Sequence, residues 1–396
     1  MDEPPKQYVS DIIQQPDSVG NALRGVPCPA SQCSYPLHGT PRRAFPTEAV
    51  GAPRVLLAGK LTALEAPGGG EVQMSALAKA LGEVGVDAQP WRPWEKRLAD
   101  CDCLHLFGSE PEHLILIASA HRQGVPVALS TIAWFELASC WREPWPLRRR
   151  LAACGKYLAR RACPRLGSWR RRLYHAADLL LPNSEAEAEQ LTRHFEAPPR
   201  RIRVVPNGAD TRFAEASPEM FARLVGCRDF VLCAGRIEPR KNQLGLLRAF
   251  ASCDVPVVLV GDVVPGHEAY LAACRRAAGP HVRFIGRLEH DDPLLAGAFA
   301  ACGCLVLASW YETPGLVALE AGMSGVPLVL PRGGCAREYF GEHAEYVAPN
   351  DLAGLRRAVN AARAKGRSRK LAELVRRNYS WRSAALATRK AYETIL

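Results

Sequence analysis

Short apolar runs that alternate with helical stretches recur along this 396-residue chain, and this alternation limits the fold more than any other feature. A strand that leads through a turn into a helix, repeated several times, is typical of a parallel sheet with helices on both faces. The predicted strands are 54–59, 101–107, 125–131, 230–233, 257–260, 283–285, 304–307 and 328–330. The sequence therefore predicts an α/β fold, and the chain is long enough for two ordinary domains rather than one.

Two carboxylates lie eight positions apart around the turn after the predicted strand 304–307. Glu312 falls in the turn, and Pro314 suits a helix start because its nitrogen needs no hydrogen there. Glu320 falls about one and a half turns into that helix, so its side chain can return to the same pocket. A carboxylate in that position can accept hydrogen bonds from the two vicinal hydroxyls of a ribose. The alternative is a capped surface helix with two unrelated glutamates.

The start of the same helix favours an anion. The backbone N–H groups of Gly315, Leu316 and Val317 have no intrahelical acceptor, and the helix dipole adds to their positive potential. We therefore expect these three residues to contact a diphosphate, and we also expect Thr313 to bind the donor.

A cationic turn follows the predicted strand 230–233. Arg236 and Lys241 place a guanidinium and an ammonium group after its C-terminal end. Such groups can neutralise a pyrophosphate, whose negative charge rises as a glycosidic bond to it breaks. A solvated basic loop is the alternative.

Together these segments resemble the glycosyltransferases with the GT-B fold and the E-x7-E signature, of the group 1, family 4 type, and in particular bacterial surface-polysaccharide members. Further segments match the family's landmarks in the same order, over residues 53–396. They are 177–184, 204–210, 284–287, 325–329 and 379–381.

The resemblance implies roles for individual residues. Arg236 and Lys241 match positions that hold the donor diphosphate, and Glu320 matches the residue that binds the ribose. Glu312 matches the residue that faces the donor sugar, for which we expect sugar binding and transition-state stabilisation. Arg287 is expected on the nucleobase side.

The family fold implies two Rossmann-like domains whose parallel sheets face a central cleft. Residues 1–48, rich in proline and without sustained periodicity, are expected to form a disordered leader. The expected domains are an N-terminal acceptor-side domain at 49–212 and a C-terminal donor domain at 213–378, with a linker near 206–216. The last residues, 379–396, are expected to cross back onto the first domain, with the last helix at about 383–396.

Polar groups of the first domain are expected to reach the cleft. A glycine loop precedes a helix expected at 72–81, and Gly69 and Gly70 can approach a donor or acceptor closely. His105 and Ser130 lie near predicted strand ends, where open α/β sheets bind ligands, and are acceptor-side candidates. A structural role for His105 is the alternative. Many family members carry a histidine just after the strand 125–131, and this chain has none there.

Composition narrows the class of protein. Neither a run of about twenty apolar residues nor an apolar signal core is found, so a cytoplasmic protein is expected. The 14 cysteines are expected to be reduced core residues, since their spacing matches no zinc site. We predict no metal or other cofactor.

The net charge of +11 is concentrated in one segment. Residues 142–172 hold eleven Arg or Lys residues and one acid, and Leu147, Leu151 and Leu158 recur there at helical spacing. This pattern suits an anionic membrane surface, which would place the protein peripherally at the inner face of the membrane. A solvated face or a partner-binding helix stays open, whereas nucleic-acid binding is not predicted because no matching motif is present.

The resemblance thus predicts a retaining glycosyltransferase that moves a hexose from a nucleoside-diphosphate sugar to a glycan or lipid-linked acceptor, in bacterial exopolysaccharide or lipopolysaccharide synthesis. The alternative is a noncatalytic protein of the same fold that binds a sugar nucleotide or polysaccharide. The presence of Arg236, Lys241, Glu312 and Glu320 argues against that alternative.

Overall fold

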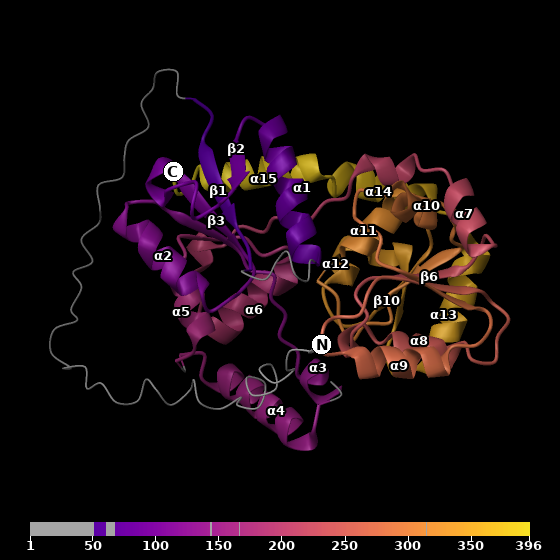
Figure 1. Cartoon of the computed structure of the whole chain (residues 1–396). Helices are drawn as coiled ribbons and strands as arrows, with labels where there is room; N and C mark the ends of the chain where they lie inside the picture. Colours follow the sequence, from indigo (N-terminus) through magenta and orange to yellow (C-terminus); the bar gives the residue numbers. More distant parts are fainter. Residues whose placement is uncertain (1–50, 61–67, 143–144, 166, 314) are drawn as a thin grey trace, which may run out of the picture. The chain divides into compact units, whose positions relative to one another are not determined.

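Two parallel sheets organise the chain (Figure 1). The computed structural model describes residues 51–60, 68–142, 145–165, 167–313 and 315–396, so the leader predicted at 1–48 lies outside the described residues. We call the five-stranded sheet with its helices the first lobe, and the six-stranded sheet with its helices the second lobe. Both lobes fall within one unit, Ala44–Leu396.

The first lobe has the strand order β2-β1-β3-β4-β5, and its paired strands are parallel. Its strands are β1 (Arg54–Ala58), β2 (Asp87–Pro90), β3 (Cys103–Phe107), β4 (Val127–Ser130) and β5 (Leu179–Leu180). Its helices are α1 (Gly69–Glu83), α2 (His113–Arg122), α3 (Leu137–Arg142), α4 (Leu147–Ala162), α5 (Trp169–Ala176) and α6 (Glu185–Phe195).

The second lobe has the strand order β11-β10-β9-β6-β7-β8, also with parallel pairs. Its strands are β6 (Val231–Ala234), β7 (Val257–Val260), β8 (Val282–Gly286), β9 (Cys304–Val306), β10 (Leu328–Pro331) and β11 (Ala344–Val347). Its helices are α7 (Glu219–Val225), α8 (Gln243–Ala249), α9 (Glu268–Ala277), α10 (Pro293–Ala301), α11 (Leu316–Met323), α12 (Ala336–Phe340), α13 (Leu352–Lys365) and α14 (Arg369–Asn378).

Each sheet has an apolar core on both faces, because successive strand residues point to opposite sides. In β1, Leu56 packs into one core while Val55 and Leu57 pack into the other. Burial on both faces explains why the central strands are continuous apolar runs.

The C-terminal segment runs back beside the first lobe. Ala209 pairs with Ser380 in a parallel bridge, and α15 (Trp381–Tyr392) packs against α1. A Cβ atom on Gly208 would lie 2.3 Å from the backbone nitrogen of Trp381, so this close approach requires glycine.

Two helix starts differ from the sequence prediction. The helix expected at 72–81 begins at Gly69, so the second and third glycines of the predicted loop form its first turn. The last helix was expected at 383–396 and spans Trp381–Tyr392, with Ser380 as its N-cap.

Candidate active site

A buried ion pair lies at the C-terminal ends of the central strands of the second lobe. Glu312 follows β9, its side chain is only 4% exposed, and its Oε1 lies 2.6 Å from Nζ of Lys241, in the turn after β6. Ser309 donates a second hydrogen bond to the same oxygen at 2.5 Å. Burial opposes ionisation of Glu312, but Lys241 and Arg240 outweigh it and hold the pKa of that carboxyl below its usual value. Glu312 is therefore an anion with a matched cation.

Arg236 lies across from the start of α1. A Cβ atom on Gly68 would lie 3.1 Å from Nη1 of Arg236, and one on Gly69 would lie 3.8 Å from Cδ1 of Leu316 at the start of α11. Two helix N-termini therefore face the same space as an arginine that is 42% exposed. This combination of N–H groups and positive charge suits a diphosphate.

Glu320 lies inside α11 and is paired with a histidine. Its Oε1 accepts a hydrogen bond from Nε2 of His290 at 2.8 Å, and its side chain is 5% exposed. Arg212 contacts the other ring nitrogen of His290 at 3.3 Å and also donates to its backbone carbonyl. With Nδ1 accepting from an arginine, the proton of a neutral ring lies on Nε2 and points at Glu320.

The other predicted donor contacts of the second lobe are at least partly exposed. Thr313, Gly315, Leu316 and Val317 are half-buried. Gly315 is the N-cap of α11 in a left-handed conformation (φ 84°), and Pro314 lies outside the described residues. Arg287 follows β8, is 42% exposed and pairs with Glu289 at 2.8 Å.

The placement of His105 and Ser130 does not fit an acceptor-side role. His105 is fully buried in β3, and its two ring nitrogens bond the hydroxyls of Tyr392 at 2.7 Å and Ser130 at 2.9 Å. Burial lowers the pKa of His105 to about 3, so the ring is neutral. Because both nitrogens are occupied and no surface is exposed, the pair stabilises the junction between the first sheet and α15. Gly70 packs beside Ile132 of the turn after β4.

A buried carboxylate that was not predicted from the sequence bonds that turn. Glu187 is fully buried in α6 and accepts hydrogen bonds from the Thr131 hydroxyl and from the backbone of Ala133 and Asn183. Ile132, between two of these donors, has a positive φ of 44°, which is strained for a β-branched residue. The pattern Asn-Ser-Glu at a helix start suggests an N-cap at Ser184 but does not show that Glu187 is buried.

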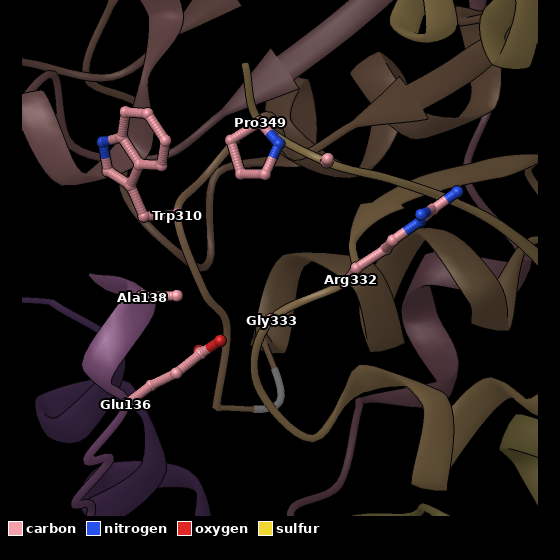
Figure 2. Close-up of a pocket in the computed structure, with 7 residues that line it drawn as sticks. Glu136, Ala138, Trp310, Arg332, Gly333 and Pro349 are labelled. Atoms are coloured by element: carbon pink, nitrogen blue, oxygen red, sulfur yellow. The ribbon is translucent and has the colours of Figure 1, made fainter. Parts of the chain in front are cut away.

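A small pocket of about 230 Å³ lies beside Glu312, where the two lobes meet. Figure 2 shows the Trp310 ring beside Pro349, with the Glu136 side chain pointing from the first lobe toward the loop that carries Gly333. Its remaining lining residues are Ala138, Arg332, Gly333 and Ala348.

Among the described residues, no group of three potential metal ligands comes together. In the same part of the chain, no helix is long and apolar enough to cross a membrane.

Two family models match the chain, one in each lobe. Residues 86–213 match Glycosyltransferase Family 4, and residues 228–364 match Glycosyl transferases group 1. The chain belongs to these glycosyltransferases. Its fold is GT-B: sucrose-phosphate synthase from Thermosynechococcus elongatus aligns with a TM-score of 0.65 at 17% identity, over 86% of this chain and 99% of that one. Anabaena HepE, solved with UDP and glucose, aligns with a TM-score of 0.61 at 18% identity, over 87% and 99% of the two chains.

Two curated relatives are similar to this glycosyltransferase over more than half of its length. A D-inositol 3-phosphate glycosyltransferase from an Arthrobacter species is 29% identical over 67% of this chain and 68% of its own length. A glycogen synthase of Mycobacterium tuberculosis is 29% identical over 57% of this chain and 55% of its own. Other D-inositol 3-phosphate glycosyltransferases match over less than half of their length.

Proposed function

We propose that this glycosyltransferase moves a hexose from a nucleoside-diphosphate sugar to a glycan or lipid-linked acceptor, with retention of configuration. The observation that carries the donor assignment is the buried Lys241–Glu312 pair, which lies at the start of α11 and in the same group of strand ends as Arg236. Its lysine can donate hydrogen bonds to a diphosphate, and the carboxylate beside it can contact the sugar. The names of the relatives and the resemblance of the motifs support the same reaction class.

The residues divide the work of the transfer. Arg236, Lys241 and the N–H groups of α11 bind the diphosphate and stabilise the charge that it gains when the bond to the anomeric carbon breaks. The acceptor hydroxyl forms the new bond to that carbon and gives up its proton to an oxygen of the departing diphosphate. Because Lys241 and Ser309 compensate the charge of Glu312, its anion is suited to stabilising positive charge on the sugar rather than to attacking it. Retention itself rests on the family resemblance.

Metal ions are not needed in this proposal, since arginine, lysine and two helix N-termini supply the positive charge around the leaving group. Turnover should therefore persist in the presence of a chelator.

The acceptor is the least constrained substrate. Segments 312–316 and 336–341 resemble members that build exopolysaccharide or lipopolysaccharide, which supports a glycan or lipid-linked acceptor. The relatives act, by name, on D-inositol 3-phosphate or in glycogen synthesis, which makes a phosphorylated polyol a second candidate. A screen of these acceptor classes with an accepted donor decides between them.

Replacing the lysine tests the donor assignment. Lys241→Ala should lower turnover by roughly 10²-fold or more, the scale of losing one such electrostatic contact in the transition state. The exposed Lys370→Ala in α14 is the matched control and should behave as wild type. Unchanged turnover of Lys241→Ala would contradict the assignment. Nucleotide binding without any transfer or hydrolysis would favour the noncatalytic alternative.

A further inference from the structure

The strand order leaves half of the second sheet's binding edge outside the donor site. β9, which leads to Glu312, lies between β6 and β10. The cations Arg236 and Lys241 follow β6 and Arg287 follows β8, so a nucleotide that contacts them extends along the β6–β8 side. The pocket residues that follow β10 and β11 lie on the opposite side of Glu312. This side is therefore open to another part of the substrates.

The pocket is formed by both lobes at a place where only glycine fits. A Cβ atom on Gly333 would lie 2.6 Å from the carbonyl oxygen of Trp310 and 3.0 Å from Oε2 of Glu136. The glycine thus lets a carboxylate of the first lobe approach the backbone of the second. The volume of about 230 Å³ is below the ~300–1,000 Å³ of pockets for drug-sized ligands, so it suits a single ring.

The lining offers the contacts that a sugar ring uses. Trp310 is only partly buried and gives an aromatic surface. The Glu136 carboxylate also accepts from Nε1 of Trp134, and Nε of Arg332 donates to the carbonyl of Tyr346, both at 3.3 Å. A carboxylate and a guanidinium are an acceptor and a donor that sugar hydroxyl groups bond.

Backbone hydrogen bonds hold Trp310 close to the reaction centre. The N–H of Trp310 donates to the carbonyl of Arg240 at 3.0 Å, and the N–H of Glu312 donates to the carbonyl of Gly333 at 3.3 Å. One lining residue, Gly333, is thus hydrogen-bonded to the backbone of the residue proposed to face the donor sugar.

We propose that this pocket is an acceptor subsite that binds one pyranose ring, with Trp310 as the stacking platform and Arg332 and Glu136 as specificity-determining residues. The proposal rests on the proposed glycosyl transfer for its purpose, but the binding itself can be tested without a turnover assay.

Ligand-observed saturation-transfer NMR tests the subsite with methyl α-D-glucopyranoside, methyl α-D-mannopyranoside and methyl β-D-galactopyranoside as separate probes. At least one should bind the wild-type chain. Trp310→Ala should weaken that binding roughly tenfold, the scale of one lost aromatic contact, and Trp310→Phe should restore much of it. Trp94→Ala, at a tryptophan that is 97% exposed, is the matched control and should bind as wild type.

Two results would overturn the subsite: none of the probes binds the wild-type chain, or Trp310→Ala binds as well as the wild-type chain. A third concerns the donor, because displacement of the probe by UDP-glucose but not by UDP would place the donor's own sugar in the pocket. Calorimetry with nucleoside diphosphates separates the two proposals. If nucleoside-diphosphate binding depends on Lys241 while Trp310→Ala leaves the NMR signal of the pyranoside unchanged, only the subsite is wrong. If no diphosphate binds while the signal depends on Trp310, the proposed function is wrong and the pocket stands.

Discussion

Glu312, which precedes α11, and Glu320, within α11, are both buried, and their bonding partners give them different roles. Glu312 has a lysine at 2.6 Å, so its anion is compensated before any substrate arrives. Glu320 has the Nε2 of His290 at 2.8 Å on one oxygen, and a ribose hydroxyl can bond its second oxygen. Residue type alone does not distinguish them, whereas the partners do.

Nucleotide binding should separate these two carboxylates. Glu320→Ala should weaken binding of a bare nucleoside diphosphate about tenfold, because it removes hydrogen bonds to the ribose. Glu312→Gln should leave that binding nearly intact and impair sugar transfer, while avoiding the empty space that alanine would leave beside Lys241. Calorimetry with the nucleotide alone measures both. Equal affinity of both variants and the wild-type chain would refute the ribose role of Glu320.

His290 allows a finer version of the same experiment. His290→Ala should weaken binding of the nucleotide, because Glu320 loses the hydrogen bond that orients its carboxylate. His290→Gln should recover affinity, because its side-chain amide restores an N–H donor. A residue with a purely structural role would lower the melting temperature without this difference between alanine and glutamine.

At the scale of elements, the turn after β4 is held in a strained conformation by α6. Glu187 bonds both residues that flank Ile132, whose positive φ persists only because its surroundings fix it. Burial raises the pKa of Glu187 to about 7, so its carboxyl loses its proton near neutral pH. The stability of this turn should therefore depend on pH.

The sign of that dependence follows from linkage. The folded state binds the Glu187 proton more tightly than the unfolded chain, so its contribution to stability is greatest below the ordinary pKa of 4.5 and is lost as pH rises to about 7. Urea unfolding at several pH values should show the wild-type chain losing up to about 3 kcal/mol relative to Glu187→Gln across this window. A difference between the two proteins that does not change with pH would contradict the assignment.

The central strands and the edge strand β8 were predictable from sequence, whereas the edge strands β2 and β11 were not. The runs that became β6, β7, β9 and β10 are apolar because both faces of each strand are buried. The terminal strands β2 and β11 are partly exposed, so their sequences Asp-Ala-Gln-Pro and Ala-Glu-Tyr-Val lack that pattern and were missed.

The site shows the same division between local and distant information. Glu312 and Glu320 could be related because one helix sets their spacing, although whether they bind the donor is still a prediction. The approach of Glu136 to Gly333 joins segments almost two hundred positions apart, and no local pattern encodes it. His105 was misjudged because a strand end in the sequence does not reveal that α15 covers it.

At the scale of the whole molecule, the positive charge and an uncovered apolar face occur on the same helix. No described residue of α4 is buried, and Leu147, Leu151 and Leu158 are 55%, 54% and 51% exposed. In Figure 1, α4 lies below α5 and α6. The side of α4 that faces away from these leucines packs on α6, where the Arg160 guanidinium lies over the Phe195 ring. The leucines are thus left uncovered within the described chain, flanked by Arg148, Arg150 and Arg161.

An anionic membrane surface fits this helix, because leucines can enter the interface while arginines bind lipid phosphates. Each basic residue near such a surface contributes about 1 kcal/mol, so several give reversible binding that high salt should release. Replacing Arg148, Arg150 and Arg161 with glutamine should abolish cosedimentation with vesicles that contain phosphatidylglycerol. Replacing Arg356, Arg357 and Lys370 with glutamine removes the same charge from exposed positions of α13 and α14 and should leave binding largely intact. Changing Leu151 and Leu158 to glutamine should weaken binding without altering the charge. If the wild-type chain ignores these vesicles at low salt, a protein partner or a solvated face would be the better account of α4.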